Sequence, residues 1–164
     1  MRRALLTTLL AAVLLAENGS REARSDAPGR AAADDVFEAV FRQHVEELLD
    51  PEARSRGTSL CLGVDPGGAP QSVSREFLDR FRDEPTVRRS AECEARPAGA
   101  VTLGVAGPAV IVTAGPIEWV AADEAWVTVS CFWSRARTRR WQYRVVREPT
   151  GWVSLGPIIR QAPA

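Results

Sequence analysis

The chain has 164 residues, of which 45% are hydrophobic and 26% are charged, a composition typical of a globular domain. Its 21 basic and 21 acidic residues cancel, so net charge gives no reason to expect nucleic acid or a membrane surface as a partner. All the basic residues are arginine, which we attribute to a GC-rich genome. One histidine, and three cysteines without a C-x-x-C pair, do not provide the ligands of a zinc site. The chain also has no phosphate-binding or dinucleotide-binding motif, so we expect no metal and no cofactor.

The first residues have the pattern of a secretory signal peptide. Arg2 and Arg3 precede an uncharged apolar run, Ala4–Ala16, which is shorter than the roughly 20 residues of a membrane span. We predict a signal peptide over residues 1–16 and export in soluble form to the periplasm or the cell exterior, with no other membrane attachment. Residues 17–33 are polar or small, which predicts a disordered tether. Residues 34–164 then form a single domain.

The clearest periodicity follows the tether, in DDVFEAVFRQHVEELLDP. Its apolar residues recur at helical spacing and form one stripe: Val36, Phe37, Val40, Phe41, Val45, Leu48 and Leu49. Asp34 or Asp35 is suited to cap the first N–H groups, and Pro51 ends the pattern. The sequence predicts a long helix here.

A short strand and a second helix are expected next. In TSLCLGV, residues 58–64, apolar residues alternate with small ones, which indicates a strand. After the turn residues DPGGAP, SVSREFLDRFRDE has helical spacing behind a cap at Ser72 or Ser74, and Pro85 ends it. TVRRSAECEA, residues 86–95, alternates again and predicts another strand.

From Val101 onward the pattern is that of antiparallel strands, with a Gly-Pro turn after the first apolar run. PIEWVAADEAWVTVSCFWS predicts a hairpin with its turn near Ala122 and Asp123. That turn would place Trp119 opposite Trp126 as a cross-strand pair.

RRWQYRVVREPTGWVSLGPII predicts a second hairpin, in which Pro149 fixes a turn dihedral and Gly151 takes a positive φ. Helices followed by strands indicate an α+β domain. We expect a long N-terminal helix packed on a curved, mainly antiparallel sheet, with a short strand and a second helix before the meander.

The long N-terminal helix and the closing YRVVREPTGWVSLG resemble the NTF2-like (cystatin-like) superfamily, whose fold is a cone-shaped α+β domain. The segment CLGVDP…FLDRF…SAEC is also similar to a group of short exported bacterial proteins with no established activity. The resemblance implies a helix wrapped by a curved sheet. By analogy with isomerases of the superfamily, it also implies an alternative function, in which His44 is the base of a pocket that contains Tyr143.

Three cysteines leave one unpaired if a disulfide forms, and an oxidising compartment permits disulfides. Cys61 and Cys93 lie on two predicted strands that flank one helix. A bridge between them would close a loop of about 30 residues and stabilise the fold by roughly 3 kcal/mol. Cys131 shares the apolar face of its strand with Val127 and Val129, where a free cysteine packs as a small core residue. We predict the Cys61–Cys93 bridge, and a pairing that involves Cys131 is the alternative.

The sequence indicates no assembled catalytic set. His44 lies at the edge of the helix stripe, which favours a boundary position half in solvent over a catalytic one. A nucleophilic Cys131 would need a base or a positive environment nearby. Two acidic groups are interpreted as a helix cap and as a solvated, arginine-paired helix face: Asp34 and Asp35, and Asp79, Asp83 and Glu84.

The most unusual segment is CFWSRARTRRWQYRVVRE. Between Ala125 and Arg147 the chain has six arginines and no acidic residue. Arginines beside aromatic rings can bind an anionic ligand through charge and stacking. The competing interpretation is a solvated loop over Arg135–Arg140 followed by an outward strand face. The candidate ligand-binding residues are Trp133, Trp141, Tyr143, Arg139, Arg140 and Arg144.

We therefore expect a non-catalytic exported domain that binds a small ligand or a protein partner. One alternative is a small NTF2-like enzyme with His44 and Tyr143 in a pocket. Another is an interaction module that binds an acidic protein partner through the hairpin Arg135–Arg147. Side chains of His44 and Tyr143 more than about 10 Å apart would exclude the enzyme, because acid–base partners must come within hydrogen-bonding range.

Overall fold

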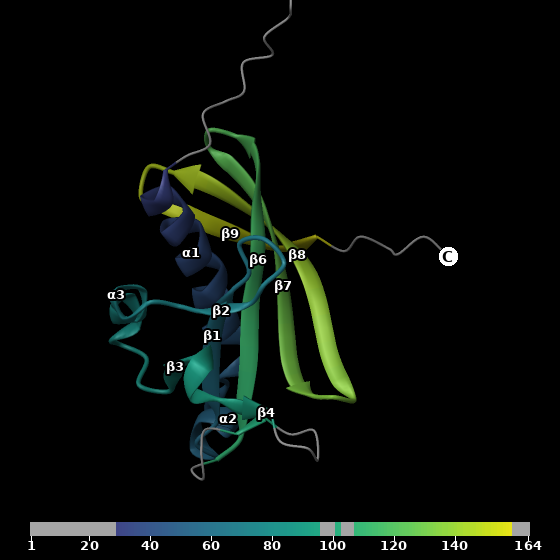
Figure 1. Cartoon of the computed structure of the whole chain (residues 1–164). Helices are drawn as coiled ribbons and strands as arrows, with labels where there is room; N and C mark the ends of the chain where they lie inside the picture. The colour runs from purple at the N-terminus through teal and green to yellow at the C-terminus, as the bar shows by residue number, and fades with distance from the viewer. Residues whose placement is uncertain (1–28, 96–100, 103–106, 159–164) are drawn as a thin grey trace, which may run out of the picture.

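The computed structural model describes residues 29–95, 101–102 and 107–158. The predicted signal peptide and residues 17–28 of the predicted tether lie outside these ranges. The described residues form an α+β domain with one long helix against a mainly antiparallel sheet, as the sequence predicts. Figure 1 shows the helix lying along the sheet, with a short helix on its far side.

The long helix, α1, spans Arg30–Leu48 and therefore begins four residues before the predicted start. Its N-cap is Gly29, so Asp34 and Asp35 lie inside the helix and the predicted cap is wrong. Three alanines, residues 31–33, explain the difference, because alanine is the strongest helix former and extends the helix by a turn. The last residues of the predicted tether are thus helical.

The segment after α1 consists of short elements. The residue before Pro51, Asp50, caps the next helix by accepting a hydrogen bond from the Ala53 N–H at 2.7 Å. Ser74, one of the two predicted caps, accepts from the Phe77 N–H at 3.0 Å. The elements are α2 (Pro51–Ser55), β1 (Ser59–Val64), β2 (Gln71–Ser72), α3 (Arg75–Leu78), the 3-10 helix η1 (Asp79–Phe81), β3 (Val87–Arg89), the 3-10 helix η2 (Ser90–Glu92), β4 (Glu94–Ala95) and β5 (Val101–Thr102).

One predicted strand is interrupted. The alternation over residues 86–95 continues as a strand only through β3, and η2 then turns the chain before β4. β3 pairs with β1, whereas β4 pairs with β5 in a separate two-stranded sheet. Alternating polarity alone does not distinguish one strand from two strands with a turn between them.

The remaining chain forms four long strands, β6 (Ala109–Ala121), β7 (Glu124–Ser134), β8 (Arg137–Glu148) and β9 (Gly151–Ile158). Both predicted hairpins are present, and Gly151 has the expected positive φ of 134°. The main sheet has the order β2-β1-β6-β7-β8-β9, with β3 also paired to β1. β1 runs parallel to β6 and β3, and the other pairs are antiparallel.

An irregularity in β6 reverses which side chains face the helix. Val110, Val112 and Ala114, all even-numbered, are buried on the inner face. After Gly115 and Pro116 the inward side chains belong to odd-numbered residues. A second shift follows between Trp119 and Ala121. As a result, Trp119 is opposite Ala125 and Trp126 is opposite Glu118, so the predicted Trp119–Trp126 pair is wrong.

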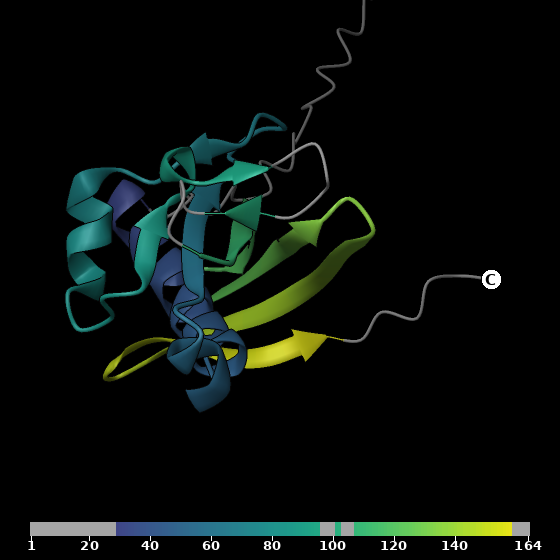
Figure 2. The same cartoon turned by 90° about the horizontal axis from the view of Figure 1, so that it is seen from below.

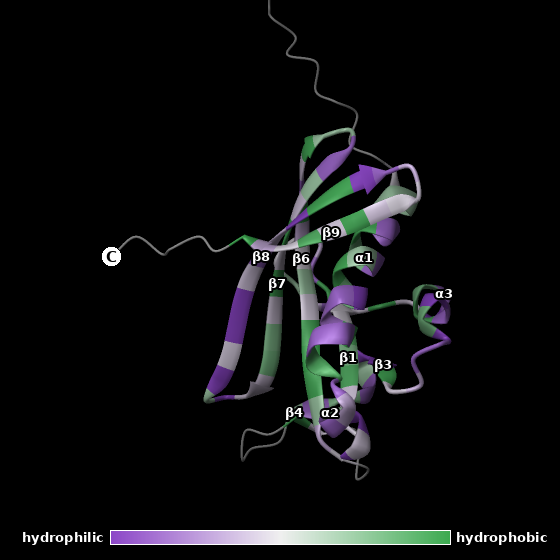
Figure 3. Ribbon diagram, turned by 180° about the vertical axis from the view of Figure 1, so that it is seen from behind, coloured by the Kyte–Doolittle hydropathy of each residue, from purple (hydrophilic) through white to green (hydrophobic). Residues whose placement is uncertain are grey.

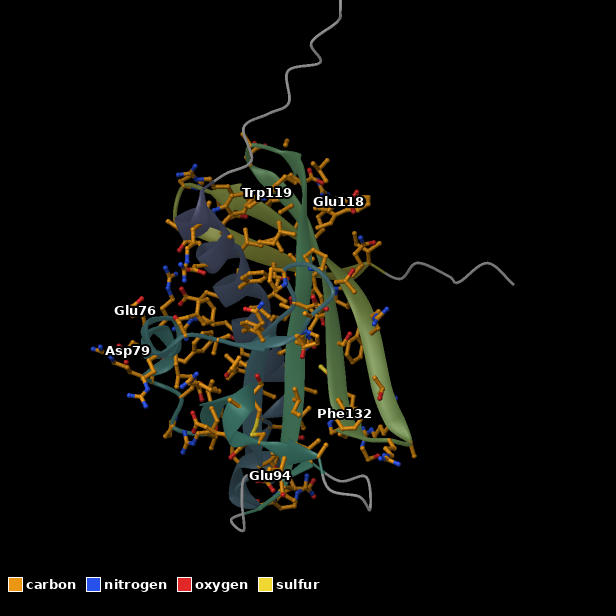
Figure 4. The ribbon with its side chains drawn as sticks, viewed as in Figure 1. Glu76, Asp79, Glu94, Glu118, Trp119 and Phe132 are labelled. Atoms are coloured by element: carbon orange, nitrogen blue, oxygen red, sulfur yellow. A yellow bond between two sulfur atoms is a disulfide. The ribbon has the colours of Figure 1, made fainter. Side chains whose placement is uncertain are left out.

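Trp119 instead packs edge-to-face on Trp152 of β9, with ring centroids 5.6 Å apart. Figure 4 shows Trp119 near the end of the sheet where the N-terminus of α1 lies. The pair therefore covers one end of the core.

The core lies between α1 and the concave face of the sheet. Seen from below, the strands curve around one side of α1 and α3 lies on the other side (Figure 2). Five side chains of α1 are buried: Val36, Val40, Phe41, His44 and Val45. They meet inward residues of the long strands: Val110, Val112, Ala114, Ala125, Val127, Val129, Cys131, Tyr143 and Val145.

Cys61 and Cys93 form the predicted disulfide, with their Cα atoms 6.4 Å apart. Cys61 is on β1, and Cys93 follows η2 just beyond β3, the parallel neighbour of β1. The adjacency of these two strands is what brings the cysteines together. Cys131 is free and buried, as predicted.

Replacing both Cys61 and Cys93 with serine is expected to lower the free energy of unfolding by roughly 3 kcal/mol, because the bridge restricts the unfolded chain. Urea denaturation of the oxidised protein and the variant measures this difference. Thiol titration of the denatured protein before reduction should give one free thiol. A result of three free thiols would contradict the bridge.

Phe41 is fully buried and packs edge-to-face on Phe77, with ring centroids 5.9 Å apart. Phe41→Ala is expected to cost about 3–5 kcal/mol of unfolding free energy, because it leaves a cavity between α1 and its neighbours. Leu155→Ala is the control, since Leu155 is 54% exposed, and it should change stability by no more than about 0.5 kcal/mol. Equal effects in urea denaturation would contradict this description of the core.

Candidate functional site

The six candidate ligand-binding residues divide between the two faces of the sheet. The register pairs Arg139 with Cys131, Trp141 with Val129 and Tyr143 with Val127, so these three β8 side chains belong to the concave face. Arg140 and Arg144 alternate with them and lie on the convex face. Trp133, at the end of β7, packs edge-to-face on Trp141 with centroids 6.5 Å apart, which places it with the concave set. The structure therefore does not bring the six residues into one site.

The convex-face arginines have partners within the sheet. Arg144 forms a bidentate ion pair with Glu124 on β7, with Nε and Nη2 each 2.9 Å from a carboxylate oxygen. This pairing lowers the pKa of Glu124 and raises that of Arg144. The Nε of Arg140 donates to the Ser130 hydroxyl at 3.2 Å. Arg144 is thus already neutralised by a neighbouring strand.

The region Arg135–Arg140 is exposed, as in the competing interpretation, but it is mostly strand and not a loop. Only Arg135 and Ala136 form the turn between β7 and β8, and Arg137–Arg140 belong to β8. The hairpin extends away from α1 beyond the region paired with β9 (Figures 1 and 2). Its concave face is therefore uncovered by the helix near the turn.

A groove of about 470 Å³ lies where the hairpin separates from the end of α1. Three other pockets among the described residues are smaller, at about 290, 370 and 380 Å³. Trp133 forms part of its wall, and Phe132 in Figure 4 marks this end of β7. The lining residues come from α1, α2, four strands and the segments between them: Glu47, Leu48, Asp50, Ala53, Arg56, Thr58, Val101, Pro108, Ala109, Val110, Trp133 and Arg137.

The groove combines an apolar floor with charged groups at its sides. Val101, Ala109 and Val110 are almost fully buried side chains that still line the groove. On the hairpin side, the guanidinium of Arg137 lies 4.8 Å from the centre of the Trp133 ring, a cation–π contact. Arg137 makes no ion pair with any residue in the described ranges. This cation is therefore available to a ligand.

The carboxylates on the helix side of the groove already have hydrogen-bond partners. Glu47 accepts from the side chain of Gln43 at 2.8 Å, and Asp50 caps α2. Arg56, which also lines the groove, is paired with Glu52. Neither Glu47 nor Asp50 forms an ion pair with Arg137 in the described ranges.

A second group of reactive side chains is buried between α1 and the sheet. His44 is 1% exposed, so the prediction of a boundary histidine half in solvent is wrong. Its ring centroid is 5.1 Å from that of Tyr143, and its Nδ1 lies 4.0 Å from the sulfur of Cys131. The Nε2 of His44 has no hydrogen-bond partner among the described residues. The pair proposed for the enzyme alternative is thus together, within the 10 Å limit.

Burial keeps this cluster uncharged. Desolvation lowers the pKa of His44 to about 4 and raises the pKa of the Cys131 thiol to about 12. The pKa of Tyr143 is also raised, chiefly by burial. Neither His44 nor Tyr143 lines any of the four pockets above. A neutral histidine beside a protonated thiol can form a weak hydrogen bond, but it does not generate a thiolate nucleophile.

The buried His44 makes stability depend on pH. Its pKa is about 4 in the folded protein and about 6.5 in the unfolded chain, so the unfolded chain binds more protons between these values. The contribution of neutral His44 to the free energy of unfolding is fully present above about pH 6.5 and is lost as the pH falls to about 4. The loss should approach about 3 kcal/mol.

The test compares the wild type with His44→Phe, which has no titratable group at this position. The variant keeps all the carboxylates, so it reports their share of the pH dependence. Urea denaturation from about pH 7 to about pH 4 should show that the free energy of unfolding falls more in the wild type than in the variant. Equal falls in the two proteins would show that His44 does not titrate in this way.

The acidic residues near α3 form ion pairs with arginines, but Asp83 and Glu84 pair with arginines of other helices and not, as predicted, with arginines along the same helix face. Asp83 lies 2.9 Å from Arg42, and Glu84 lies 2.6 Å from Arg54, so these pairs join this segment to α1 and α2. Asp79, which points away from α1 in Figure 4, pairs with Arg82 at 3.4 Å. Within the described ranges, no group of three or more His, Cys, Asp or Glu residues could hold a metal ion.

Sequence reasoning identified Trp133 but not the rest of the groove, and it did not connect His44 with Cys131. The groove lining is far apart in sequence and carries no motif. For the buried pair a signal was present, because Cys131 is on the apolar face of its strand and His44 adjoins the apolar stripe of its helix. Among the described residues, no helix is both long and apolar enough to cross a membrane.

Comparison of the chain with protein-family models, with curated proteins and with solved structures finds no match.

Proposed function

We propose that the chain is a non-catalytic binding domain and that the groove beside Trp133 is its ligand site. The proposal rests on one observation: the apolar floor of the groove lies next to the unpaired guanidinium of Arg137. Apolar pockets with a few placed polar groups are the usual form of small-molecule sites. The ligand class that fits best is a small amphipathic anion, with its apolar part against Trp133 and its charge near Arg137.

Two further proposals concern location and kinship. Export to the periplasm or the cell exterior is supported by the Cys61–Cys93 bridge, since disulfides persist in oxidising compartments. Kinship with the NTF2-like superfamily stays a prediction, and the helix inside a curved sheet is compatible with it. Such a fold supports many functions, so it does not identify the ligand.

The enzyme alternative has one observation in its favour and one against it. The proximity of His44 to Tyr143 favours it. Their burial disfavours it, because a substrate must reach the acid–base pair. We therefore propose the groove, which is open to solvent, as the ligand site.

Isothermal titration with decanoate tests the groove, with decyltrimethylammonium below its micellar concentration as the probe of opposite charge. We expect decanoate to bind more tightly. Arg137→Gln should weaken decanoate binding about tenfold, which corresponds to the loss of about 1.4 kcal/mol from one charge contact. Trp133→Ala should weaken the binding of both probes, since it removes apolar contact area.

Matched controls are Arg147→Gln and Trp119→Phe, because both residues lie outside the groove. Both controls should bind decanoate as the wild type does. Unchanged decanoate affinity in Arg137→Gln and Trp133→Ala would remove the groove as the site.

A further inference from the structure

Part of β8 has a free outer edge within the described structure. β9 pairs with β8 only from Gln142 to Glu148, whereas β8 begins at Arg137. Over residues 137–141 its inner edge is bonded to β7, and no other described strand pairs with the outer edge. The outward N–H and C=O groups of this stretch can therefore accept another strand.

The three edge strands of the main sheet are protected in ways that this stretch is not. β2 has only two residues and β3 only three. β9 carries Pro157, has a register shift beside Tyr143 and packs on α1. Short length, proline, irregular register and a covering helix all discourage strand addition. Residues 138–141 are in regular register with β7, after one shift between the pairs formed by Arg137 and Thr138, and the stretch contains no proline, so charge is the main feature of this edge.

That charge is positive. Arg137, Arg139 and Arg140 are exposed, and no carboxylate in the described ranges pairs with them. Figure 3 shows the corresponding hydrophilic stretch of β8 toward the hairpin turn. Pairing of this edge with the same edge of a second copy would place arginines against arginines, which is unfavourable. An acidic strand would meet complementary charge instead.

We propose that residues 137–141 of β8 bind an extended acidic segment of a partner protein by strand addition. Backbone hydrogen bonds to the outer edge hold the segment, and its carboxylates pair with Arg139 on the concave face and Arg140 on the convex face. The partly buried ring of Trp141 offers an apolar contact at the end of the stretch. This surface shares Arg137 with the groove, but Arg139, Arg140 and the backbone edge are not part of the groove lining, so the proposal does not depend on the ligand proposed above.

The test uses a short blocked peptide in which pairs of glutamates alternate with pairs of valines, so that an added strand carries carboxylates on both faces. Its lysine–valine counterpart reports the role of charge, and a version N-methylated on every second residue reports backbone pairing. Binding is measured by titration calorimetry, and protection of the outward-pointing amides among residues 137–141 by hydrogen exchange. We expect only the unmodified acidic peptide to bind well and to protect these amides.

Arg139→Glu should weaken binding of the acidic peptide more than tenfold. Arg147→Glu is the matched control, because it makes the same charge change on an exposed residue of the same strand where β9 covers the edge. It should keep affinity within about threefold of wild type. Equal losses in the two variants, or equal binding of the N-methylated peptide, would overturn the proposal. A dimer protected at 137–141 without peptide would also overturn it, by assigning the edge to a second copy.

Discussion

The apolar face of α1 is buried between two layers, and the rest of the fold is organised around that burial. One side of the helix meets the inward residues of β6, β7 and β8, and the other side meets Phe77 of α3. Each fully buried side chain of this kind contributes roughly 1.5–3 kcal/mol relative to exposure. The sheet has to curve to surround a single helix, and the irregularities in β6 supply a change of direction as well as of register.

Ion pairs fix α3 and η1 against the outer side of the same helix. Arg80 reaches both Asp35 and Glu38 of α1, at 2.7 and 2.8 Å, and its guanidinium lies 5.9 Å from the centre of the Phe77 ring. Arg42 pairs with Asp83 and also lies over Phe81. Partly exposed pairs contribute little free energy individually. They specify where the short helix sits, while the phenylalanine rings beneath them provide most of the attraction.

The features that the sequence predicts well are those determined by neighbours along the chain. The α1 stripe, both hairpin turns and the positive φ of Gly151 are local, and periodicity or turn chemistry identifies them. The partner of Trp119 is not local, since it depends on two shifts of register whose positions no alternation pattern reveals. The burial of His44 likewise depends on how far the sheet extends around the helix. In the candidate site, the arginines and tryptophans were evident from composition. Which of them face α1 follows only from the register of β8 against β7 and from the position of the helix.

β1 lies parallel to β6, and this pairing has a consequence for how the chain folds. The strands β6 to β9 are joined by tight turns and form contacts that are close in sequence, whereas β1 must find β6 across the intervening helix and disulfide-bonded segment. Contacts of that kind form slowly. The helix that all these strands surround is also the first described element to leave the ribosome, and β9, which packs on it, is the last. The cover of α1 consequently stays incomplete until β9, the last described strand, has been translated.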